Sequence, residues 1–331
     1  IDLRNSRCKQ AFEELVRNSD VLVDNWGSGA FKRLGLGYQH LNELNHGLVY
    51  ASITGYGDSE GLTGPYSARP ANNLAIQAMS GWMEITGDPD GPPQSVGDNI
   101  GDSIPGVWTA LAIVLALETR RQTGKGQYLD MAMYECMVSH IESNMNFFQA
   151  IGSNPGRSKD RLATAGITFK AKDGYVVLAG LRTETRMRDL WTLLGRNDLL
   201  EGDRRYLAGP GMDGQFYQDH VIPAIELWSS QLGKFDVAAK LTEIGFSMGV
   251  TQTMGDLDAC PQLNARQMFL ETGDTLGGTF RGVKTPTRLT ACVDAPTGAP
   301  PKLGEHNADI LCSLGGMTAE EVAVLEAEGA I

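Results

Sequence analysis

The chain has 331 residues, of which 42% are hydrophobic, and its formal net charge at pH 7 is −12. This length and apolar content suffice for a sizeable core or two domains, whereas the negative charge disfavours binding to nucleic acid or to an anionic membrane surface. The five cysteines and five histidines are scattered without metal-ligand spacing, which predicts a reduced, cytoplasmic setting and no metal site.

The first part of the chain alternates helical and strand-like segments. The expected elements are helices over 5–18, 30–34, 38–45 and 73–86, with short buried strands over 20–24 and 48–53. This order predicts an α/β fold with a doubly wound parallel sheet. Ligands of such sheets bind beyond the carboxyl ends of the strands, which places a site near Asn25 and Gly55. Because Ile1 leads directly into the first helix, we expect a further piece of chain before it.

A single carboxylate, Asp102, stands where an irregular Gly- and Pro-rich loop over 87–100 meets an apolar helix expected over 104–120. A side-chain oxygen there meets free backbone N–H groups and the positive end of the helix. Asp102 is therefore an N-cap, an ionised group that takes part in chemistry, or both. The apolar run over 107–117 is short of the ~20 residues that a membrane span needs.

The pattern of expected helices and strands changes after about residue 160. After the helix expected over 104–120, the sequence predicts a strand over 127–133 and a helix over 134–152. Beyond residue 160 the expected elements are a hairpin over 167–179, helices over 184–194, 216–231 and 235–244, an extended segment over 279–289 and a helix over 318–328. The mixed segment 165–275 is interpreted as a second, smaller α+β domain.

Several short strings occur together in a familiar order. They are Ser52–Gly57, Gly64–Tyr66, Arg69-Pro70, Gln77–Gly81, Thr86–Pro93, Gly101-Asp102, Arg121–Gln127, Asp130, Pro261–Phe269 and Leu303–His306. Together they resemble the class III CoA-transferases of the formyl-CoA and carnitine type, a superfamily shared with alpha-methylacyl-CoA racemase. The resemblance covers nearly the whole chain, so it is specific although each string alone is weak.

The resemblance implies an enzyme that moves CoA from an acyl-CoA donor to a free carboxylic acid. The family's aspartate after glycine falls on Asp102, which would attack the thioester and form aspartyl anhydride and aspartyl-CoA intermediates. CoA is then a substrate carrier, and no metal or redox cofactor is implied. By position in the family's motifs, the CoA contacts fall on Asn25, Trp26, Ala30, Arg33 and Leu34, with Arg69 as a further candidate. A solvated helix face is the alternative interpretation of Arg33.

The family's architecture gives further expectations. A Rossmann-like large domain would combine 1–164 with 276–331, a small domain would span 165–275, and the family's first strands would lie before Ile1. The partner is expected to be a second copy in an interlocked homodimer, or a paralogous subunit. Two departures stand out: Gly27-Ser28-Gly29 replaces an Arg-Pro-Gly triplet, and 162–166 replaces a four-glycine loop that closes the family's active site.

Three other functions stay open at this point. An acyl-CoA racemase needs a His/Asp acid–base pair, and the histidine position falls on Asn72, whose amide cannot transfer protons. A non-catalytic scaffold subunit would not need Asp102. An NAD-dependent dehydrogenase is suggested by the alternating elements alone, since no GxGxxG motif follows an expected strand.

Overall fold

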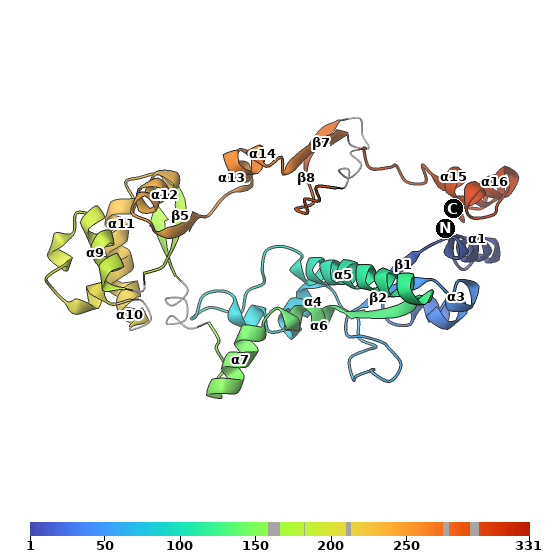
Figure 1. The fold of residues 1–331 in the computed structure, drawn as a ribbon, viewed down its shortest axis with the longest axis horizontal. Coiled ribbons are helices and arrows are strands. Elements are labelled where there is room, and N and C mark those ends of the chain that lie inside the picture. The colour runs from blue at the N-terminus through green and yellow to red at the C-terminus, as the bar shows by residue number, and fades with distance from the viewer. Residues whose placement is uncertain (158–165, 182, 210–212, 274–277, 292–297) are drawn as a thin grey trace.

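The computed structural model describes residues 1–157, 166–181, 183–209, 213–273, 278–291 and 298–331. Its first part is a parallel sheet with helices around it (Figure 1). The elements are α1 Ser6–Arg17, β1 Val21–Asp24, α2 Ala30–Arg33, α3 Tyr38–Leu44, β2 Val49–Thr54, α4 Asn73–Met79, a 3-10 turn Met83–Ile85, α5 Ile100–Thr123, β3 Gln127–Ala132, α6 Met133–Ser139 and α7 Glu142–Ile151. The predicted strands and the α/β class are confirmed.

The sheet has three strands in the order β1-β2-β3, all parallel. Their carboxyl ends lie in register, so that Asp24, Ser52 and Asp130 stand side by side at one edge. Strand β2 is buried along nearly its whole length, as expected for the central strand of a parallel sheet. The loops that follow the strands therefore converge where the sequence predicted a site.

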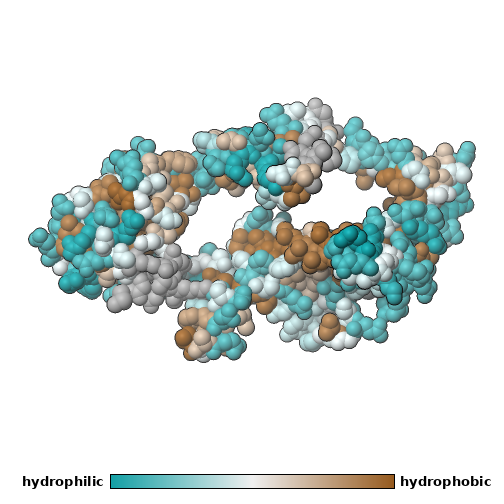
Figure 2. All heavy atoms as spheres, viewed as in Figure 1, coloured by the Kyte–Doolittle hydropathy of each residue, from teal (hydrophilic) through white to brown (hydrophobic). Residues whose placement is uncertain are grey.

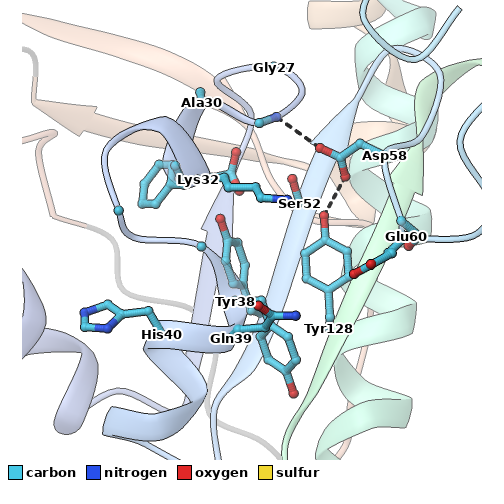
Figure 3. A pocket seen from close by; sticks show the side chains of 17 residues that line it. Gly27, Ala30, Lys32, Tyr38, Gln39, His40, Ser52, Asp58, Glu60 and Tyr128 are labelled. Carbon is cyan, nitrogen blue, oxygen red and sulfur yellow. Dashed lines mark hydrogen bonds between the residues drawn. The ribbon is translucent and has the colours of Figure 1, made fainter.

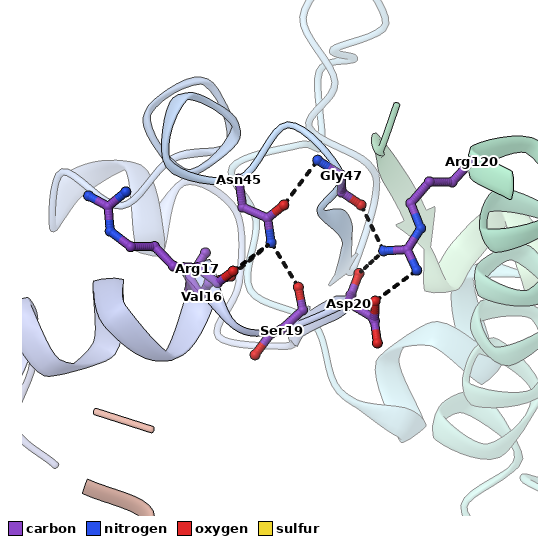
Figure 4. Close-up of polar contacts among 7 residues, drawn as sticks. All are labelled: Val16, Arg17, Ser19, Asp20, Asn45, Gly47 and Arg120. Atoms are coloured by element: carbon purple, nitrogen blue, oxygen red, sulfur yellow. Dashed lines mark hydrogen bonds and ion pairs between the residues drawn. The ribbon is translucent and has the colours of Figure 1, made fainter. Parts of the chain in front are cut away.

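The carboxy-terminal end of α5 is fixed to the amino-terminal edge of the sheet by two polar side chains (Figure 4). The Asn45 amide nitrogen donates to the carbonyls of Val16 and Ser19 at 3.0 and 2.8 Å. Arg120 of α5 donates to the Gly47 carbonyl at 3.0 Å and pairs with the Asp20 carboxylate at 2.8 Å. This network holds α5 along the sheet, with its first turn at the opposite, carboxyl edge.

A second group of elements forms its own core. They are β4 Ile167–Ala171, β5 Gly174–Ala179, α9 Glu184–Leu193, short helical turns over 197–199, 204–207 and 214–221, α11 Ile222–Ser229, α12 Lys234–Glu243 and β6 Ser247–Val250. The three strands form an antiparallel sheet whose buried face packs with Trp191 and Tyr217 in one cluster running from Ile167 to Phe246. The predicted hairpin is confirmed, and the domain limit at 275 stays a prediction.

The remaining elements return towards the amino terminus. They are α13 Met254–Asp258, α14 Pro261–Ala265, the hairpin β7 Phe269–Gly273 with β8 Thr279–Val283, α15 Asn307–Ser313 and α16 Ala319–Ala327. Leu311 and Val322 pack on Ala11 of α1, and the Asp2 backbone N–H donates to the Ala330 carbonyl at 2.7 Å. The two termini consequently lie next to each other (Figure 1).

Several predicted boundaries were wrong. The apolar helix begins at Ile100 instead of residue 104, the helix over 73–86 ends at Met79, and the helix over 134–152 is divided into α6 and α7. Strand β6 was not predicted, and the extended segment over 279–289 forms a strand only to Val283. Of the predicted glycine-loop replacement, residues 162–165 lie outside the described residues.

With 24 residues, α5 is also longer than the apolar run suggested. Within the described ranges it is the one helix long and apolar enough to cross a membrane by length and composition. A core helix meets the same criterion. One side of α5 contacts β2, β3, α4 and α6, but only 22% of its most apolar 18-residue window is buried.

Candidate active site

Asp102 lies in the first turn of α5 and lines a cavity of about 560 Å³, which we call the Asp102 cavity. Its lining residues are Asn25, Ile53, Ala71, Asn72, Asn73, Leu74, Asp102, Pro105 and Met133. Asn25 follows β1, Ile53 belongs to β2, and Met133 follows β3. The cavity thus sits beyond the carboxyl ends of three neighbouring strands, where doubly wound sheets bind ligands.

The carboxylate of Asp102 does not cap the helix. The N-cap residue is Asn99, and the Asp102 and Ser103 backbone N–H groups donate to its carbonyl at 3.0 and 2.9 Å. The Ile100 N–H donates to the Asp98 carbonyl, and the Gly101 N–H donates to Asn73 Oδ1, both at 2.9 Å. Every N–H of the first turn is therefore occupied, and the capping interpretation of Asp102 is wrong. Its exposed carboxylate accepts no hydrogen bond from any described residue.

Asn73 holds the start of α4 against the start of α5. Besides the Gly101 N–H, its Oδ1 accepts from Gln77 Nε2 at 2.9 Å, and its Nδ2 donates to Asn99 Oδ1 at 3.2 Å. A Cβ atom on residue 101 would stand 2.7 Å from the Asn73 carbonyl oxygen, so only glycine permits this approach. The Gly101-Asp102 pair is thereby held at the edge of the cavity.

Two other amide side chains line the Asp102 cavity, those of Asn25 and Asn72. Asn72 is the N-cap of α4, and its Oδ1 accepts the Ala75 N–H at 2.9 Å. The sequence had predicted Asn25 as a CoA contact but considered Asn72 only as a replacement for a histidine. Among the described lining residues, Asp102 is the single titratable group, and Ile53, Leu74 and Met133 make much of the remaining wall apolar.

A second cavity of about 370 Å³, the Tyr50 cavity, lies beneath the loop from β1 to α2 (Figure 3). It is lined by Ala30 and Lys32, together with Asp24, Gly27, Gly29, Phe31, Gly35, Gly37, Tyr38, Gln39, His40, Tyr50, Ser52, Asp58, Ser59, Glu60 and Tyr128. Asp58 accepts from the Gly29 N–H at 3.1 Å and from the Tyr128 hydroxyl at 2.7 Å. Through these two bonds, Asp58 connects the loop after β1 to strand β3.

Buried polar groups dominate the floor of the Tyr50 cavity. Asp24 is 6% exposed, and its Oδ2 has no hydrogen-bond partner among the described residues. Burial raises the pKa of Tyr50 and Tyr128 well above the ordinary tyrosine value, and the neighbouring carboxylates of Asp24 and Asp58, respectively, raise these pKa values further. Both phenols therefore keep their proton at neutral pH, and that of Tyr128 is donated to Asp58.

The other predicted CoA contacts lie outside both cavities. Arg33 donates to the Ser28 carbonyl at 3.1 Å, and the Arg69 guanidinium stacks on the Tyr66 ring at 4.1 Å. Trp26 is 58% exposed and packs its ring 5.1 Å from that of Phe31. Leu34 is half-buried in the core beside α3. Of the predicted set, the structure thus places Asn25 with Asp102, and Ala30 in the Tyr50 cavity.

The chain is similar to known proteins over most of its length. The profile of CoA-transferase family III matches residues 1–307. A succinyl-CoA:mesaconate CoA-transferase of Haloarcula hispanica is 31% identical over 321 residues, covering 95% of this chain and 78% of that protein. A formyl-CoA:oxalate CoA-transferase of Streptomyces avermitilis is 30% identical over 354 residues, covering all of this chain and 83% of that protein.

Solved structures agree with the sequence relatives. The crystal structure of a CAIB/BAIF family protein from Brucella suis superposes with a TM-score of 0.84 at 32% identity, covering 95% of this chain and 80% of that one. Some relatives are subunits, such as the beta subunit of a succinyl-CoA–L-malate CoA-transferase from Chloroflexus aurantiacus, which is 26% identical over this whole chain and 81% of that protein. The chain therefore belongs to CoA-transferase family III and is an enzyme that transfers CoA between acids.

Proposed function

We propose that this enzyme transfers CoA through covalent intermediates on Asp102. The observation that carries the proposal is the free carboxylate of Asp102, which faces a cavity at the carboxyl ends of the strands with no hydrogen-bond partner among the described residues. The positive end of α5 favours negative charge at this position. The apolar side chains of Ile53, Leu74 and Met133 line the same cavity, so an acyl group bound among them would displace water from beside the carboxylate.

The reaction proceeds in four substitutions at carbonyl carbon. An Asp102 oxygen attacks the thioester carbon of the donor, the C–S bond breaks, and CoA leaves as thiolate from a mixed anhydride. The thiolate then attacks the aspartyl carbonyl, which releases the donor acid as carboxylate and leaves an aspartyl-CoA thioester. The acceptor carboxylate attacks this thioester and displaces the thiolate again. Finally, the thiolate attacks the acyl carbonyl of the second anhydride, giving the product acyl-CoA and the free Asp102 carboxylate.

For the substrates, we propose an acyl-CoA donor and a small carboxylic acid as acceptor. The relatives named above act on succinyl-CoA with mesaconate and on formyl-CoA with oxalate. We propose that CoA runs along the loop from β1 to α2, with contacts from Asn25, Trp26, Ala30, Arg33 and Leu34, and with Arg69 as a further contact. In support, this stretch of chain contributes to the lining of both cavities, with Asn25 in one and Ala30 in the other.

The racemase alternative is not favoured by the site. A racemase needs a base on one side of the α-carbon and an acid on the other. The described lining of the Asp102 cavity offers Asp102 as its single titratable group, and Asn72 stands where the superfamily's histidine would be. A non-catalytic scaffold subunit would not need a free carboxylate at Asp102.

We also propose that the enzyme acts in the cytoplasm as a dimer.

Replacement of Asp102 tests the proposed nucleophile. In Asp102→Asn the side chain keeps its shape but cannot form an anhydride, so transfer of CoA from succinyl-CoA to labelled succinate should fall by about 10³-fold or more. The matched control is Asp98→Asn, four residues earlier, whose exposed carboxylate accepts the Asn99 N–H at 2.7 Å. The control should keep normal turnover. Full turnover in Asp102→Asn would favour the scaffold interpretation or another nucleophile.

A further inference from the structure

The first step of the proposed reaction places a full negative charge on the thioester oxygen. Enzymes that attack acyl groups supply hydrogen-bond donors for this oxygen. The usual source beside a residue in a first helical turn is the free N–H groups of that turn. In α5 these groups are occupied, by the Asp98 and Asn99 carbonyls and by the Asn73 side chain. The donor must therefore come from elsewhere in the Asp102 cavity.

Few side chains that line the Asp102 cavity can donate a hydrogen bond to the thioester oxygen. Asn73 is already committed to joining α4 to α5, because its Oδ1 accepts from Gly101 and Gln77 and one N–H of its amide donates to Asn99. The aliphatic, proline and methionine side chains cannot donate. The NH2 groups of Asn25 and Asn72 make no hydrogen bond to any described residue, and of these two Asn72 is the one whose amide orientation is fixed by the fold.

The N-cap role of Asn72 determines which end of its amide faces the cavity. A backbone N–H can donate only to an acceptor atom, so the Ala75 N–H must donate to Oδ1 of Asn72, at 2.9 Å, and not to its NH2 group. The NH2 group is then turned away from α4, and it makes no hydrogen bond to any described residue. The cap thus holds two N–H donors ready on the wall that Asn72 shares with Asp102.

We propose that Nδ2 of Asn72 donates a hydrogen bond to the thioester oxygen as Asp102 attacks, which makes Asn72 a catalytic residue of the acyl-transfer step. This inference rests on the proposed function, because it needs Asp102 as the nucleophile. Asn72 cannot transfer protons at the substrate α-carbon, as a racemase requires, but in this proposal its amide assists acyl transfer. Its ligand is the carbonyl group of an acyl thioester or of the aspartyl anhydride.

The substitution Asn72→Asp separates capping from donation. Aspartate caps a helix as well as asparagine does, so α4 keeps its N-cap, but an ionised carboxylate cannot donate and repels the oxyanion. The kcat of CoA transfer should fall by about 10²–10³-fold. As the pH is lowered and the introduced carboxyl group gains a proton, it regains an O–H donor. The ratio of the variant's rate to the wild-type rate should therefore rise on acidification.

The matched control is Asn5→Asp, the same substitution at the N-cap of α1, where Asn5 accepts from the Arg7 and Cys8 N–H groups. It should keep the wild-type rate and pH profile. A normal rate for Asn72→Asp, or a loss that is equal at every pH, would overturn the inference. If Asn72→Asp melts at a lower temperature than Asn5→Asp, Asn72→Ser is measured instead. A slow but normally folded Asn72→Ser supports the donor role, and a normal rate overturns it.

The two proposals fail in different ways. If Asp102→Asn is inactive while Asn72→Asp turns over normally, the nucleophile stands and only the role of Asn72 is lost. If Asp102→Asn turns over normally, the covalent route fails, and the role of Asn72 falls with it.

Discussion

Asp102 owes its free carboxylate to its neighbours. An aspartate in the first turn of a helix ordinarily accepts backbone N–H groups, but here Asn73 and the Asn99 carbonyl take them first. The positive end of α5 then acts on Asp102 only through space. A nucleophile needs this arrangement, because an oxygen that already accepts strong hydrogen bonds attacks a carbonyl less readily.

An ion pair between Lys234 of α12 and Asp256 of α13 makes stability depend on pH at acid pH. Lys234 is 5% exposed, and its Nζ lies 2.5 Å from Asp256 Oδ2. The bond to Lys234 and those to Thr253 lower the pKa of Asp256 from 3.8 to about 2. A lowered pKa in the folded state stabilises the fold above pH 3.8, and this contribution is lost as the pH falls through about 2.

We therefore predict that Asp256→Asn is destabilised at neutral pH, because it leaves the buried Lys234 ammonium without its charged partner. The difference in unfolding midpoint from the wild type should shrink between pH 3.8 and about 2, where wild-type Asp256 itself becomes neutral. Thermal unfolding at a series of pH values measures this. Asp236→Asn, which neutralises an exposed carboxylate on α12, is the control. A difference that does not change with pH would contradict the assignment.

The sequence predicted Asp102 as a residue of interest because Gly-Asp at a loop–helix junction has a local signature, and the structure places this residue on the wall of the Asp102 cavity. It also placed Asn25 beyond the end of a strand, which is a topological rule. It did not predict the capping of α5 by Asn99 or the bonds of Asn73, because these depend on contact between α4 and α5. For the same reason the orientation of Asn72 was not predictable, although N-cap propensity offered a hint.

At the scale of elements, the wrong helix boundaries have local causes. Helix α4 stops early because Ser80 Oγ donates back to the Ile76 carbonyl at 2.6 Å and Gly81 adopts a φ of +84°. Between α6 and α7, Ser139 Oγ donates to the Cys136 carbonyl at 2.7 Å, and the His140 ring accepts from Trp108 Nε1 of α5 at 3.0 Å. Apolar periodicity runs through both breaks, so periodicity alone predicted continuous helices.

Helix α5 begins earlier than predicted because of a tertiary contact, not a local one. The segment before residue 104 is rich in Gly and Pro and is not typical of a helix, yet α5 begins at Ile100. Gly101 allows the close approach of α4, and Asn73 then supplies an acceptor for its N–H. Tertiary contact thus extends the helix by a turn and places Asp102 inside it, which sequence patterns do not report.

At the scale of the whole molecule, α5 presents an apolar stripe to solvent. Val107, Leu111, Val114 and Leu115 are 72%, 47%, 62% and 60% exposed and lie on one face of the helix. Ile104 and Trp108 extend this face into a shallow apolar hollow beside His140. Figure 2 shows the hydrophobic surface of α5 bordering the opening in the molecule. Such a stripe is large for a chain that acts alone, which supports the proposed dimer.

Leu111→Glu tests whether this stripe is an interface. A charge in the centre of a buried apolar contact should shift the protein from twice the chain mass of 35.7 kDa towards a single chain. Light scattering after size exclusion measures the mass directly. Leu227→Glu provides the control, because Leu227 on α11 is 72% exposed without lying on the stripe. A wild-type protein of single-chain mass, or an unchanged dimer in Leu111→Glu, would contradict the proposal.

The central claim is that Asp102 becomes covalently acylated, and trapping tests it most directly. The enzyme is incubated with succinyl-CoA, quenched with hydroxylamine, digested, and its peptides are analysed by mass spectrometry. Hydroxylamine converts an aspartyl anhydride or thioester into a hydroxamate, so we predict a hydroxamate on Asp102 that forms only when an acyl-CoA is present. A hydroxamate at another residue, or none in protein that is turning over, would contradict the covalent role of Asp102.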